Sequence, residues 1–199
     1  MSPKTIILMG RSGSGKGKQG ELLKAELAKD GRSVFYLETG AKFRQFVASG
    51  SYSGQLASQA LNQGALLPSF LAVWNWGSSL LDKLTGEEHL IIDGTPRMLA
   101  EAEMFDGALK FYQRTPATFI YLNTSAAEAV KRLTLRGRSD DVTPEKINTR
   151  MQWFEQEVMP VIEHYRTSPL VKFVEINGDQ SVEVVQAEIM TKLADYLHD

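Results

Sequence analysis

Thr5-Ile6-Ile7-Leu8-Met9 is an apolar run typical of a buried strand, and Gly10-Arg11-Ser12-Gly13-Ser14-Gly15-Lys16 follows it directly. The second stretch matches G-x-x-x-x-G-K, in which glycines let backbone N–H groups point inward and form a nest for anions. The helix expected after it adds unpaired N–H groups and a positive dipole end, and Lys16 is expected to reach the β- and γ-phosphates. A glycine-rich turn without a ligand is the alternative, which the strand-loop-helix context disfavours. The pattern therefore predicts a site for a nucleoside triphosphate.

Composition limits the class of protein. The chain has 199 residues, of which 43% are hydrophobic and 23% charged, a balance that predicts one globular domain. A net charge of -2 predicts no nucleic-acid surface, and the lack of cysteine excludes disulfides and thiolate zinc sites. No apolar run is long enough for a signal segment or a membrane span. We therefore expect a cytoplasmic protein without nucleic-acid or membrane partners.

Five short apolar runs are predicted to be buried parallel strands, with helical patterns between them. The runs cover residues 5–9, 33–37, 89–92, 118–122 and 172–176. The helix signals are a leucine stripe in 16–29, a capping box from Ser125 to Glu128, the pair Thr143-Pro144, and Ser181. This alternation predicts an α/β fold, a three-layer sandwich whose five-stranded parallel sheet has helices on both faces. Ligands are then expected beyond the carboxyl ends of the strands.

The segment 39–85 is long for a connection between two strands, and its pattern is mostly helical. Its aromatic residues are expected to pack a small helical subdomain, and the alternative is an arm that clamps a second ligand. These aromatic residues are Phe43, Phe46, Tyr52, Phe70, Trp74 and Trp76.

Asp93 ends the apolar strand pattern that begins at His89. A carboxylate in this position of a nucleotide site helps to hold Mg²⁺, here through a water molecule. The alternative is that Asp93 only begins a turn with Gly94, because Asp-Gly is a common turn signal. The glycine-rich loop favours the metal role.

Several arginines fall near predicted element ends, where they are able to converge on the phosphate site. Planar, permanently charged guanidinium groups match phosphoryl groups, and phosphoryl transfer needs neutralised charge more than covalent help. The short stretch 136–141 also carries two aspartates, which suits a closing flap, although an ordinary solvated loop is the alternative. These arginines are Arg44, Arg97, Arg132, Arg136, Arg138 and Arg150.

Five segments in order resemble the motifs of the adenylate kinase family of nucleoside monophosphate kinases, over nearly the whole chain. Residues 10–19 are similar to its G-x-P-G-x-G-K-G-T-Q, residues 39–44 to T-G-D-x-x-R, and residues 64–68 to G-x-x-V-P. Residues 93–97 resemble D-G-[FY]-P-R, and residues 136–141 resemble the R-x-D-D lid segment in its short form. The resemblance implies a P-loop NTPase fold with a helical arm for the nucleoside monophosphate at about 39–85 and a short lid at about 136–142. The core would then comprise 1–38, 86–135 and 143–199 of a single domain.

The resemblance also implies roles for individual residues. ATP would be bound by Gly13, Ser14, Gly15, Lys16, Gly17, Lys18, Arg132 and Arg136, with Arg132 against the donor base. The monophosphate would be bound by Thr39, Gly40, Arg44, Leu67, Gly94, Arg97, Glu101, Arg138 and Arg150. Lys16, Arg97, Arg136, Arg138 and Arg150 would be catalytic, and Asp93 would hold Mg²⁺ through water.

Five positions depart from the family pattern. Ser12, Ala41 and Thr95 replace its proline, aspartate and aromatic residue, and the other two bear on the chemistry. Lys18 replaces a threonine, and its ammonium either adds a cation to the phosphate site or points to solvent. Glu101 replaces a glutamine that pairs with adenine, and a carboxylate only accepts hydrogen bonds. It therefore suits guanine or cytosine better than adenine, unless it turns away on the solvent face of its helix.

Taken together, the sequence predicts reversible phosphoryl transfer from ATP to a nucleoside monophosphate, with AMP as the leading acceptor and Mg²⁺ as cofactor. A kinase that prefers GMP or CMP is the alternative that Glu101 suggests. A nucleotide-binding sensor with low turnover is the alternative that Lys18 suggests. A monomer is the expectation that the resemblance carries.

Overall fold

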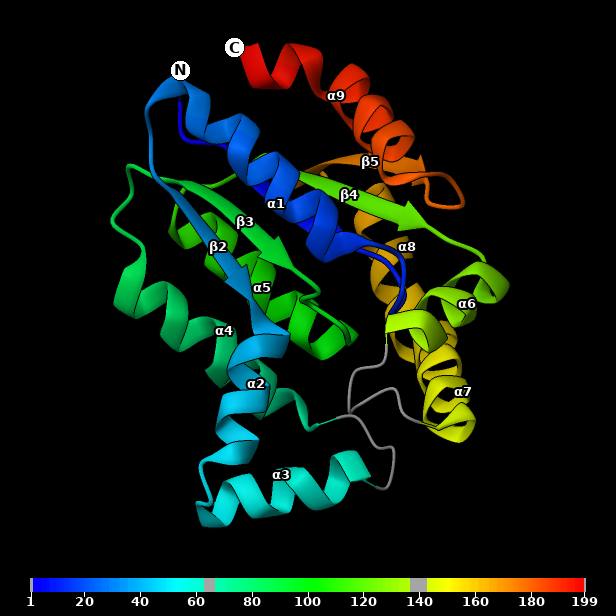
Figure 1. The fold of residues 1–199 in the computed structure, drawn as a ribbon. Coiled ribbons are helices and arrows are strands. Elements are labelled where there is room, and N and C mark those ends of the chain that lie inside the picture. Colours follow the sequence, from blue (N-terminus) through cyan, green and yellow to red (C-terminus); the bar gives the residue numbers. More distant parts are fainter. Residues whose placement is uncertain (1, 63–66, 137–142, 199) are drawn as a thin grey trace.

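The carboxyl ends of five parallel strands meet at one edge of the sheet, directly beside the glycine-rich loop (Figure 1). We describe a computed structural model that covers residues 2–62, 67–136 and 143–198. The strand order is β2-β3-β1-β4-β5, so the strand before the loop lies in the centre. The bounds are β1 (Thr5–Met9), β2 (Val34–Glu38), β3 (His89–Asp93), β4 (Ala117–Asn123) and β5 (Val171–Asn177). Each strand begins and ends within one residue of its predicted run.

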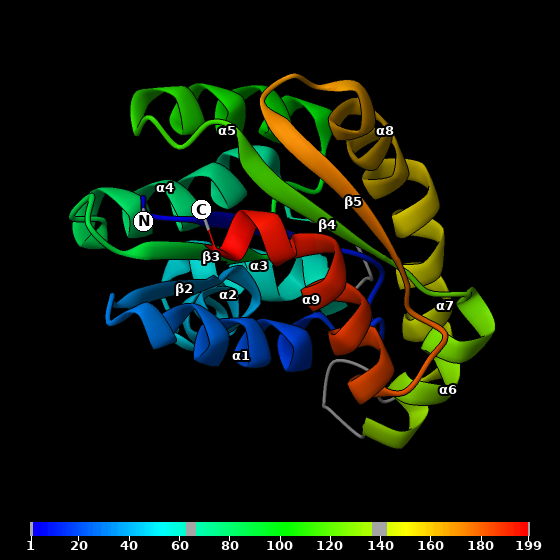
Figure 2. The same ribbon diagram turned by 90° about the horizontal axis from the view of Figure 1, so that it is seen from above.

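Alternate residues of each strand point into one of two apolar cores, which makes the sheet the middle of three layers (Figure 2). Ile6 and Leu8 face α1 (Lys16–Leu27) and α9 (Val182–His198). Ile7 and Met9 face the opposite core, which is shared with α4 (Ser69–Lys83), α5 (Leu99–Phe111) and α8 (Met159–Thr167). Strands covered on both faces read as continuous apolar runs, which is why the sequence pattern located them well.

Helices α2 (Thr39–Ala48) and α3 (Tyr52–Asn62) extend beyond the carboxyl ends of the strands, whereas α4 returns along the sheet (Figure 1). The expectation that the aromatic residues of 39–85 pack a subdomain of their own holds for Phe46 and Trp74, whose ring centres are 5.1 Å apart, but not for the whole set. Trp76 is 4% exposed and packs edge-on against Phe105 in the main core. Tyr52 and Phe70 are 77% and 68% exposed. The helical period places Trp76 on the face of α4 that meets the sheet layer, whereas Phe70 lies on an outer face of the same helix.

The helices after β4 begin close to their predicted signals, with one difference. Thr143 caps α7 (Pro144–Trp153) by accepting a hydrogen bond from the Lys146 amide, as predicted. At α6 (Ala126–Arg136) the capping box is only half formed. Ser125 Oγ accepts from the Glu128 amide, but the Glu128 side chain binds Arg132, and Asp179 accepts from the Ser125 amide instead. A tertiary partner thus replaces the local one that the sequence pattern predicted.

A short 3₁₀ turn, η1 (Ala28–Asp30), follows α1, and a π-helical turn, η3 (Phe154–Val158), joins α7 to α8. Pro160 lies in the first turn of α8 and has no N–H for a helical hydrogen bond. Such a missing bond is a recognised cause of a local widening in a helix. None of the helices in residues 2–62, 67–136 and 143–198 is both long and apolar enough to cross a bilayer.

Candidate active site

The loop between β1 and α1 has the geometry of an anion nest. Gly13 and Gly15 adopt φ values of 86° and 92°, which side chains disfavour. A Cβ atom on Gly13 would also lie 2.6 Å from the carbonyl oxygen of Ala129. The Ser14 amide closes the turn onto the Arg11 carbonyl at 3.1 Å, and the first turn of α1 contains no acidic residue. The positive end of the helix therefore faces the loop without a neutralising carboxylate.

Lys16 folds back over this loop. Its Nζ atom donates to the carbonyl oxygens of Gly10 and Arg11 at 2.7 and 3.0 Å. Burial lowers the pKa of the Lys16 ammonium to about 8, an effect that Asp93 opposes and that the charges of Arg97 and Arg136 reinforce. The ammonium is thus held by neutral acceptors at the mouth of an anion site, where a phosphate would stabilise its charged form.

Asp93 ends β3 beside the first turn of α1 and is 9% exposed. The Tyr36 hydroxyl, on the neighbouring strand β2, donates to Asp93 Oδ2 at 2.9 Å. Burial, with a contribution from Asp93, raises the pKa of the Tyr36 phenol, so the phenol remains the donor. Gly20 of α1 makes room for this bond, because a Cβ atom there would overlap the Tyr36 hydroxyl. One carboxylate oxygen is therefore oriented by Tyr36, and Oδ1 accepts no hydrogen bond within the described residues.

Arg97 and Glu101 form a second fixed unit at the start of α5. Glu101 Oε2 accepts from the Arg97 backbone amide at 2.7 Å, and Oε1 accepts from the Thr95 hydroxyl at 3.0 Å. Because Glu101 is 1% exposed, the expectation that it turns to the solvent face of its helix is wrong. Its carboxylate is instead committed to the loop that carries Arg97, and the Arg97 Nε atom donates to the Gly94 carbonyl at 2.7 Å.

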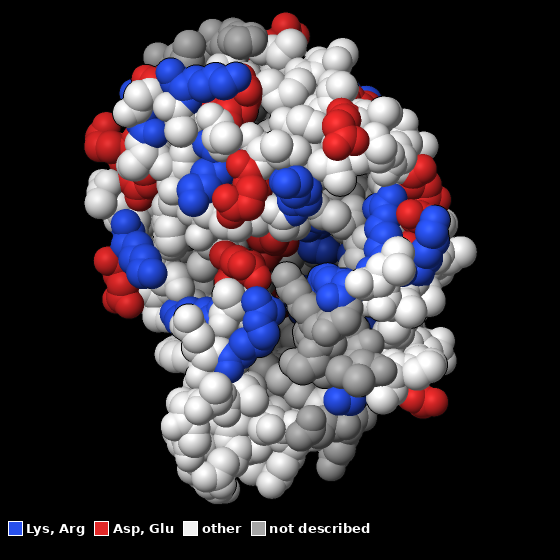
Figure 3. Space-filling view, viewed as in Figure 1, with Lys and Arg blue, Asp and Glu red and all other residues white. Residues whose placement is uncertain are grey.

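Three arginines lie within electrostatic reach of the unit formed by Lys16, Asp93 and Arg97 or belong to it. Burial lowers the pKa of the Arg97 guanidinium, Glu101 and Asp93 oppose this change, and the charge of Arg150 adds to it. The charges of Arg97 and Arg136 likewise lower the pKa of Lys16. The fold therefore brings together Lys16 of α1, Arg97 of the β3–α5 loop, Arg136 of α6 and Arg150 of α7. In the space-filling view, acidic and basic side chains lie close together near the centre of this face (Figure 3).

A cavity of about 460 Å³ lies next to the loop, on the side of α6 and α9. Arg132 lines it and is held in place by Glu128 Oε1 at 2.9 Å and by the Gln180 carbonyl at 3.1 Å. Ser14 and Gly15 of the glycine-rich loop form part of the cavity wall. Its lining residues are Ser14, Gly15, Gln19, Glu128, Arg132, Asp179, Gln180, Ser181, Val182 and Val185.

The residues predicted to bind the monophosphate are arranged less uniformly. Gly94 lies between Lys16 and Arg97, since a Cβ atom there would be 3.8 Å from Lys16 Cε and 3.2 Å from Arg97 Nη2. Arg44 pairs with Glu38 at 2.9 Å and packs against Gly40. Thr39 is buried, and its hydroxyl donates to the Asp93 carbonyl at 3.3 Å rather than facing an open space.

Leu67 is buried just before α4. Arg138, the other residues of 137–142, and the predicted base-site backbone at 64–66 lie outside the described residues. Their predicted roles therefore stay predictions.

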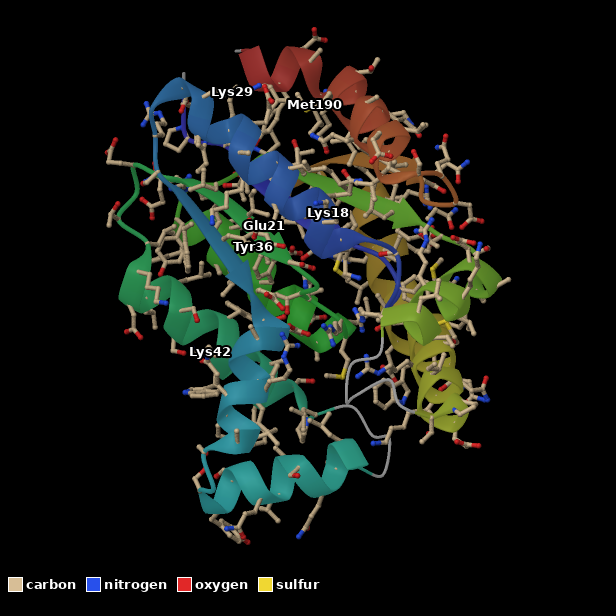
Figure 4. The ribbon with its side chains drawn as sticks, viewed as in Figure 1. Lys18, Glu21, Lys29, Tyr36, Lys42 and Met190 are labelled. Atoms are coloured by element: carbon tan, nitrogen blue, oxygen red, sulfur yellow. The ribbon has the colours of Figure 1, made fainter. Side chains whose placement is uncertain are left out.

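Lys18 lies on the exposed side of α1 (Figure 4). Hydrogen bonds from the Glu183 amide and from Ser181 lower the pKa of the Glu183 carboxyl, and the charge of Lys18 adds to this effect. The expectation that the Lys18 ammonium joins the phosphate site finds no support in this geometry, and its solvent-facing alternative does. The Lys18 side chain therefore lies on the side of α1 that is near Glu183 of α9, away from the loop.

Comparison with known proteins places this arrangement in a family. The family model described as adenylate kinase matches residues 8–169. The chain belongs to the adenylate kinase family. It is 32% identical to the adenylate kinase of Azobacteroides pseudotrichonymphae over 192 residues, which cover 94% of this chain and 96% of that protein. It is 33% identical to the adenylate kinase of Thermosynechococcus vestitus over 198 residues, covering 96% and 97% of the two chains.

Adenylate kinases generally use ATP with Mg²⁺, and the residues present are compatible with that ion. Mg²⁺ is bound in such sites by one or two carboxylates together with substrate phosphates and water. Asp93 supplies one oriented carboxylate next to the phosphate nest, and Lys18 lies away from it. Within residues 2–62, 67–136 and 143–198 no group of three or more carboxylate or histidine ligands gathers as an all-protein metal site.

Two residues with contacts beside the candidate site, Tyr36 and Arg11, were not predicted from the sequence. Tyr36 lies in an apolar strand pattern that gives no sign of a polar contact. Its hydroxyl reaches Asp93 only because β2 pairs with β3 in the observed register. Arg11 lies inside the glycine-rich loop but its side chain is buried against η3, where Glu155 pairs with it at 2.9 Å. For Arg11, the only feature of the local sequence that could have drawn attention to it is the presence of an arginine within the glycine-rich loop.

Proposed function

We propose that the chain catalyses reversible phosphoryl transfer from ATP to AMP, which yields two molecules of ADP. Membership in the adenylate kinase family supports the reaction. The observation that carries the proposal is the position of Lys16, whose ammonium lies at the phosphate nest within electrostatic reach of Asp93, Arg97 and Arg136. A site built from one oriented carboxylate and several cations suits a reaction whose main demand is charge neutralisation.

In this proposal the nest and Lys16 hold the donor phosphates, and the cavity beside Arg132 takes the donor base. Arg132 has its guanidinium fixed by Glu128 and by the Gln180 carbonyl, which suits stacking on a planar ring. Gln19 ties α1 to the cavity wall, because its Nε2 atom donates to the Val182 carbonyl at 2.9 Å. Because Ser14 and Gly15 belong both to the loop and to the cavity wall, the cavity adjoins the nest, as a base and its phosphates require.

The transfer itself breaks the bond between the γ-phosphorus and its bridging oxygen and forms a bond to a phosphate oxygen of AMP. That oxygen is already anionic, so no general base is required. Arg97, Arg136 and Arg150 neutralise the charge on the phosphoryl group as it moves, while Lys16 follows the donor phosphates. Mg²⁺, when bound with ATP, neutralises the β- and γ-phosphates, and Asp93 would hold it through water.

AMP is proposed as the acceptor because the Glu101 carboxylate is already engaged by Thr95 and by the Arg97 amide. A preference for GMP or CMP that rests on this carboxylate is therefore not favoured. A low-turnover sensor that rests on Lys18 is not favoured either, because Lys18 lies away from the nest. A monomeric state, a cytoplasmic location and the roles of Arg138 and the segment 136–142 in closing the site are part of the proposal.

The arm is proposed to consist mainly of α2 and α3. Lys42 of α2 donates to the Asn75 carbonyl, Ser78 Oγ and Ser79 Oγ of α4 at 2.9, 2.7 and 2.8 Å. These bonds tie α2 to a helix that is itself part of the main core. The boundary of about 85 predicted for the arm is thus later than the packing of α4 supports.

The experiment is a coupled assay of diphosphate formation with Mg-ATP and each of AMP, GMP, CMP, UMP and dTMP. We expect turnover with AMP to exceed that with every other acceptor. The matched negative is Lys16→Met, which keeps the length of the side chain but removes its charge. Equal turnover with GMP or CMP, or equal rates in the Lys16→Met variant, would contradict the proposal.

A further inference from the structure

Arg11 carries a buried guanidinium on the phosphate loop, but its side chain turns away from the nest. Arg11 is 9% exposed, and its Nη2 atom lies 2.9 Å from Glu155 Oε1. Its Cζ atom lies 4.4 Å from the ring centre of Phe154, within the range of a cation–π interaction. Both partners belong to η3, so one side chain bridges the loop after β1 and the π-helical turn after α7.

Stability alone does not explain an arginine at this place. Within the described residues its Nε and Nη1 atoms have no hydrogen-bond partner, although both are buried. Leaving buried donors unpaired costs free energy, and an ion pair with a glutamate side chain that is 57% exposed returns little of it. An apolar side chain would fill the same space without that cost. We therefore expect Arg11 to have a function in addition to stabilising the fold.

The backbone of Arg11 connects directly to Lys16. The Arg11 carbonyl accepts from Lys16 Nζ at 3.0 Å and from the Ser14 amide at 3.1 Å. Any shift of Arg11 along the loop therefore moves the acceptor that holds the Lys16 ammonium.

The far end of the bridge connects to Arg150. The Phe154 amide donates to the carbonyl of Arg150, which lies one helical turn earlier on α7. Arg150 is near enough to Arg97 for its charge to act on that guanidinium. Phe154 thus contacts Arg11 through its ring and joins, through its backbone amide, the last turn of the helix that carries Arg150. Single π-helical turns occur frequently at functional sites, where they re-aim a helix face.

We propose that Arg11 is a positioning residue that fixes the phosphate loop against the helix carrying Arg150, so that Lys16 and Arg150 act on the same phosphoryl group. This inference rests on the proposed phosphoryl transfer. The loop and the helix come from distant parts of the chain, and both contribute cations to one reaction centre. A small displacement between them separates groups that must converge in the transition state, whereas each substrate keeps most of its own contacts.

The test is Arg11→Ala, measured as kcat and as KM for ATP and AMP. We expect kcat to fall about tenfold, with both KM values changed less than about threefold, because positioning acts mainly in the transition state. The matched control is Arg114→Ala. Arg114 is also buried, and it donates to the Glu88 and Gly86 carbonyls near the amino ends of the strands. This control should lower the melting temperature and leave kcat within about twofold.

A double-mutant cycle with Phe154→Leu separates positioning from general damage. If Arg11 acts through Phe154, the double variant is no slower than Arg11→Ala, whereas independent effects multiply. Should Arg11→Ala fail to fold, Arg11→Lys keeps the charge without the planar fork and is expected to lose about threefold or more in kcat. An unchanged kcat in the folded Arg11 variant, or multiplying losses in the cycle, would overturn the inference. A parent chain without ADP formation would instead refute the proposed function.

Discussion

The hydroxyl of Tyr36 donates to Oδ2 of Asp93 over 2.9 Å, from one parallel strand to its neighbour. A carboxylate that binds a metal through water acts best when a second group fixes its orientation. In the proposed reaction Tyr36 would orient Asp93 for the ion that accompanies ATP, and Gly20 is the residue that lets the phenol come so close to α1.

Tyr36→Phe removes this hydrogen bond and keeps the ring. We expect the Mg²⁺ concentration for half-maximal turnover to rise about tenfold, because losing an orienting partner of a metal ligand typically costs that much. Calorimetric titration of ATP with and without Mg²⁺ provides a second readout, in which the gain in affinity from the ion should shrink.

Tyr165→Phe is the matched control for that variant. The Tyr165 hydroxyl donates to Asp106 Oδ1 at 2.8 Å, which is the same kind of bond placed between α8 and α5. Its loss should cost about 1 kcal/mol of stability and leave the Mg²⁺ dependence unchanged. Equal Mg²⁺ curves for Tyr36→Phe and the parent would show that Tyr36 does not position Asp93.

ATP binding should weaken above pH 8 because the pKa of Lys16 is lowered to about 8 in the free protein. Bound phosphates favour the charged ammonium and raise its pKa. Binding therefore takes up a proton once the pH exceeds the pKa of Lys16 in the free protein. The affinity then falls toward about tenfold per pH unit until the pKa of the complex is reached. Calorimetry at pH 7, 8 and 9 without Mg²⁺ measures the effect.

Lys16→Arg separates this titration from other effects of alkaline pH. A guanidinium stays charged throughout this range, so the variant should bind ATP with nearly the same affinity at pH 7 and pH 9. The assignment fails if the parent shows no loss of affinity by pH 9, or if the variant shows the same loss.

The fold was predictable from the sequence because its signals are local. Strands buried on both faces appear as continuous apolar runs, and the glycine-rich loop lies between the first of them and α1. The site was predictable in part, since Lys16, Asp93 and Arg97 follow motif spacings. The partners of those residues were not predictable, because Tyr36 and Asp93 meet only through the pairing of two strands that are 57 residues apart.

Glu101 is a second residue whose tertiary contacts could not be predicted from the sequence. Motif alignment placed it at a base-binding position, and helix periodicity offered the solvent as the alternative. The structure instead buries it beneath the Arg97 loop, where Thr95 supplies a hydroxyl. Two residues that each depart from the family motif thus form one hydrogen bond, and only their tertiary contact reveals it.

Glu101→Gln should therefore leave the ratio of AMP to GMP turnover unchanged within about twofold, because the side chain serves Arg97 and not the base. An amide still accepts from the Arg97 amide and donates to Thr95, but the bonds lose their ionic character. We expect kcat with AMP to fall by a few fold. A clear shift of the ratio toward AMP would mean that the carboxylate contacts the base.

Lys18→Thr restores the residue type of the family motif at an exposed position of α1. Since Lys18 lies away from the nest, we expect the Mg²⁺ titration of turnover to stay within about twofold of the parent, as for most surface substitutions. A stronger dependence on Mg²⁺ in the variant would show that the Lys18 ammonium reaches the phosphates during turnover.

The most direct measurement is phosphorus NMR of the purified chain with Mg-ATP and AMP. We predict that the ATP and AMP signals decrease together while ADP appears at two molecules for each AMP consumed. The reverse reaction should start from ADP alone. ATP that binds but is not converted, or that is hydrolysed while AMP stays constant, would contradict phosphoryl transfer between the two nucleotides.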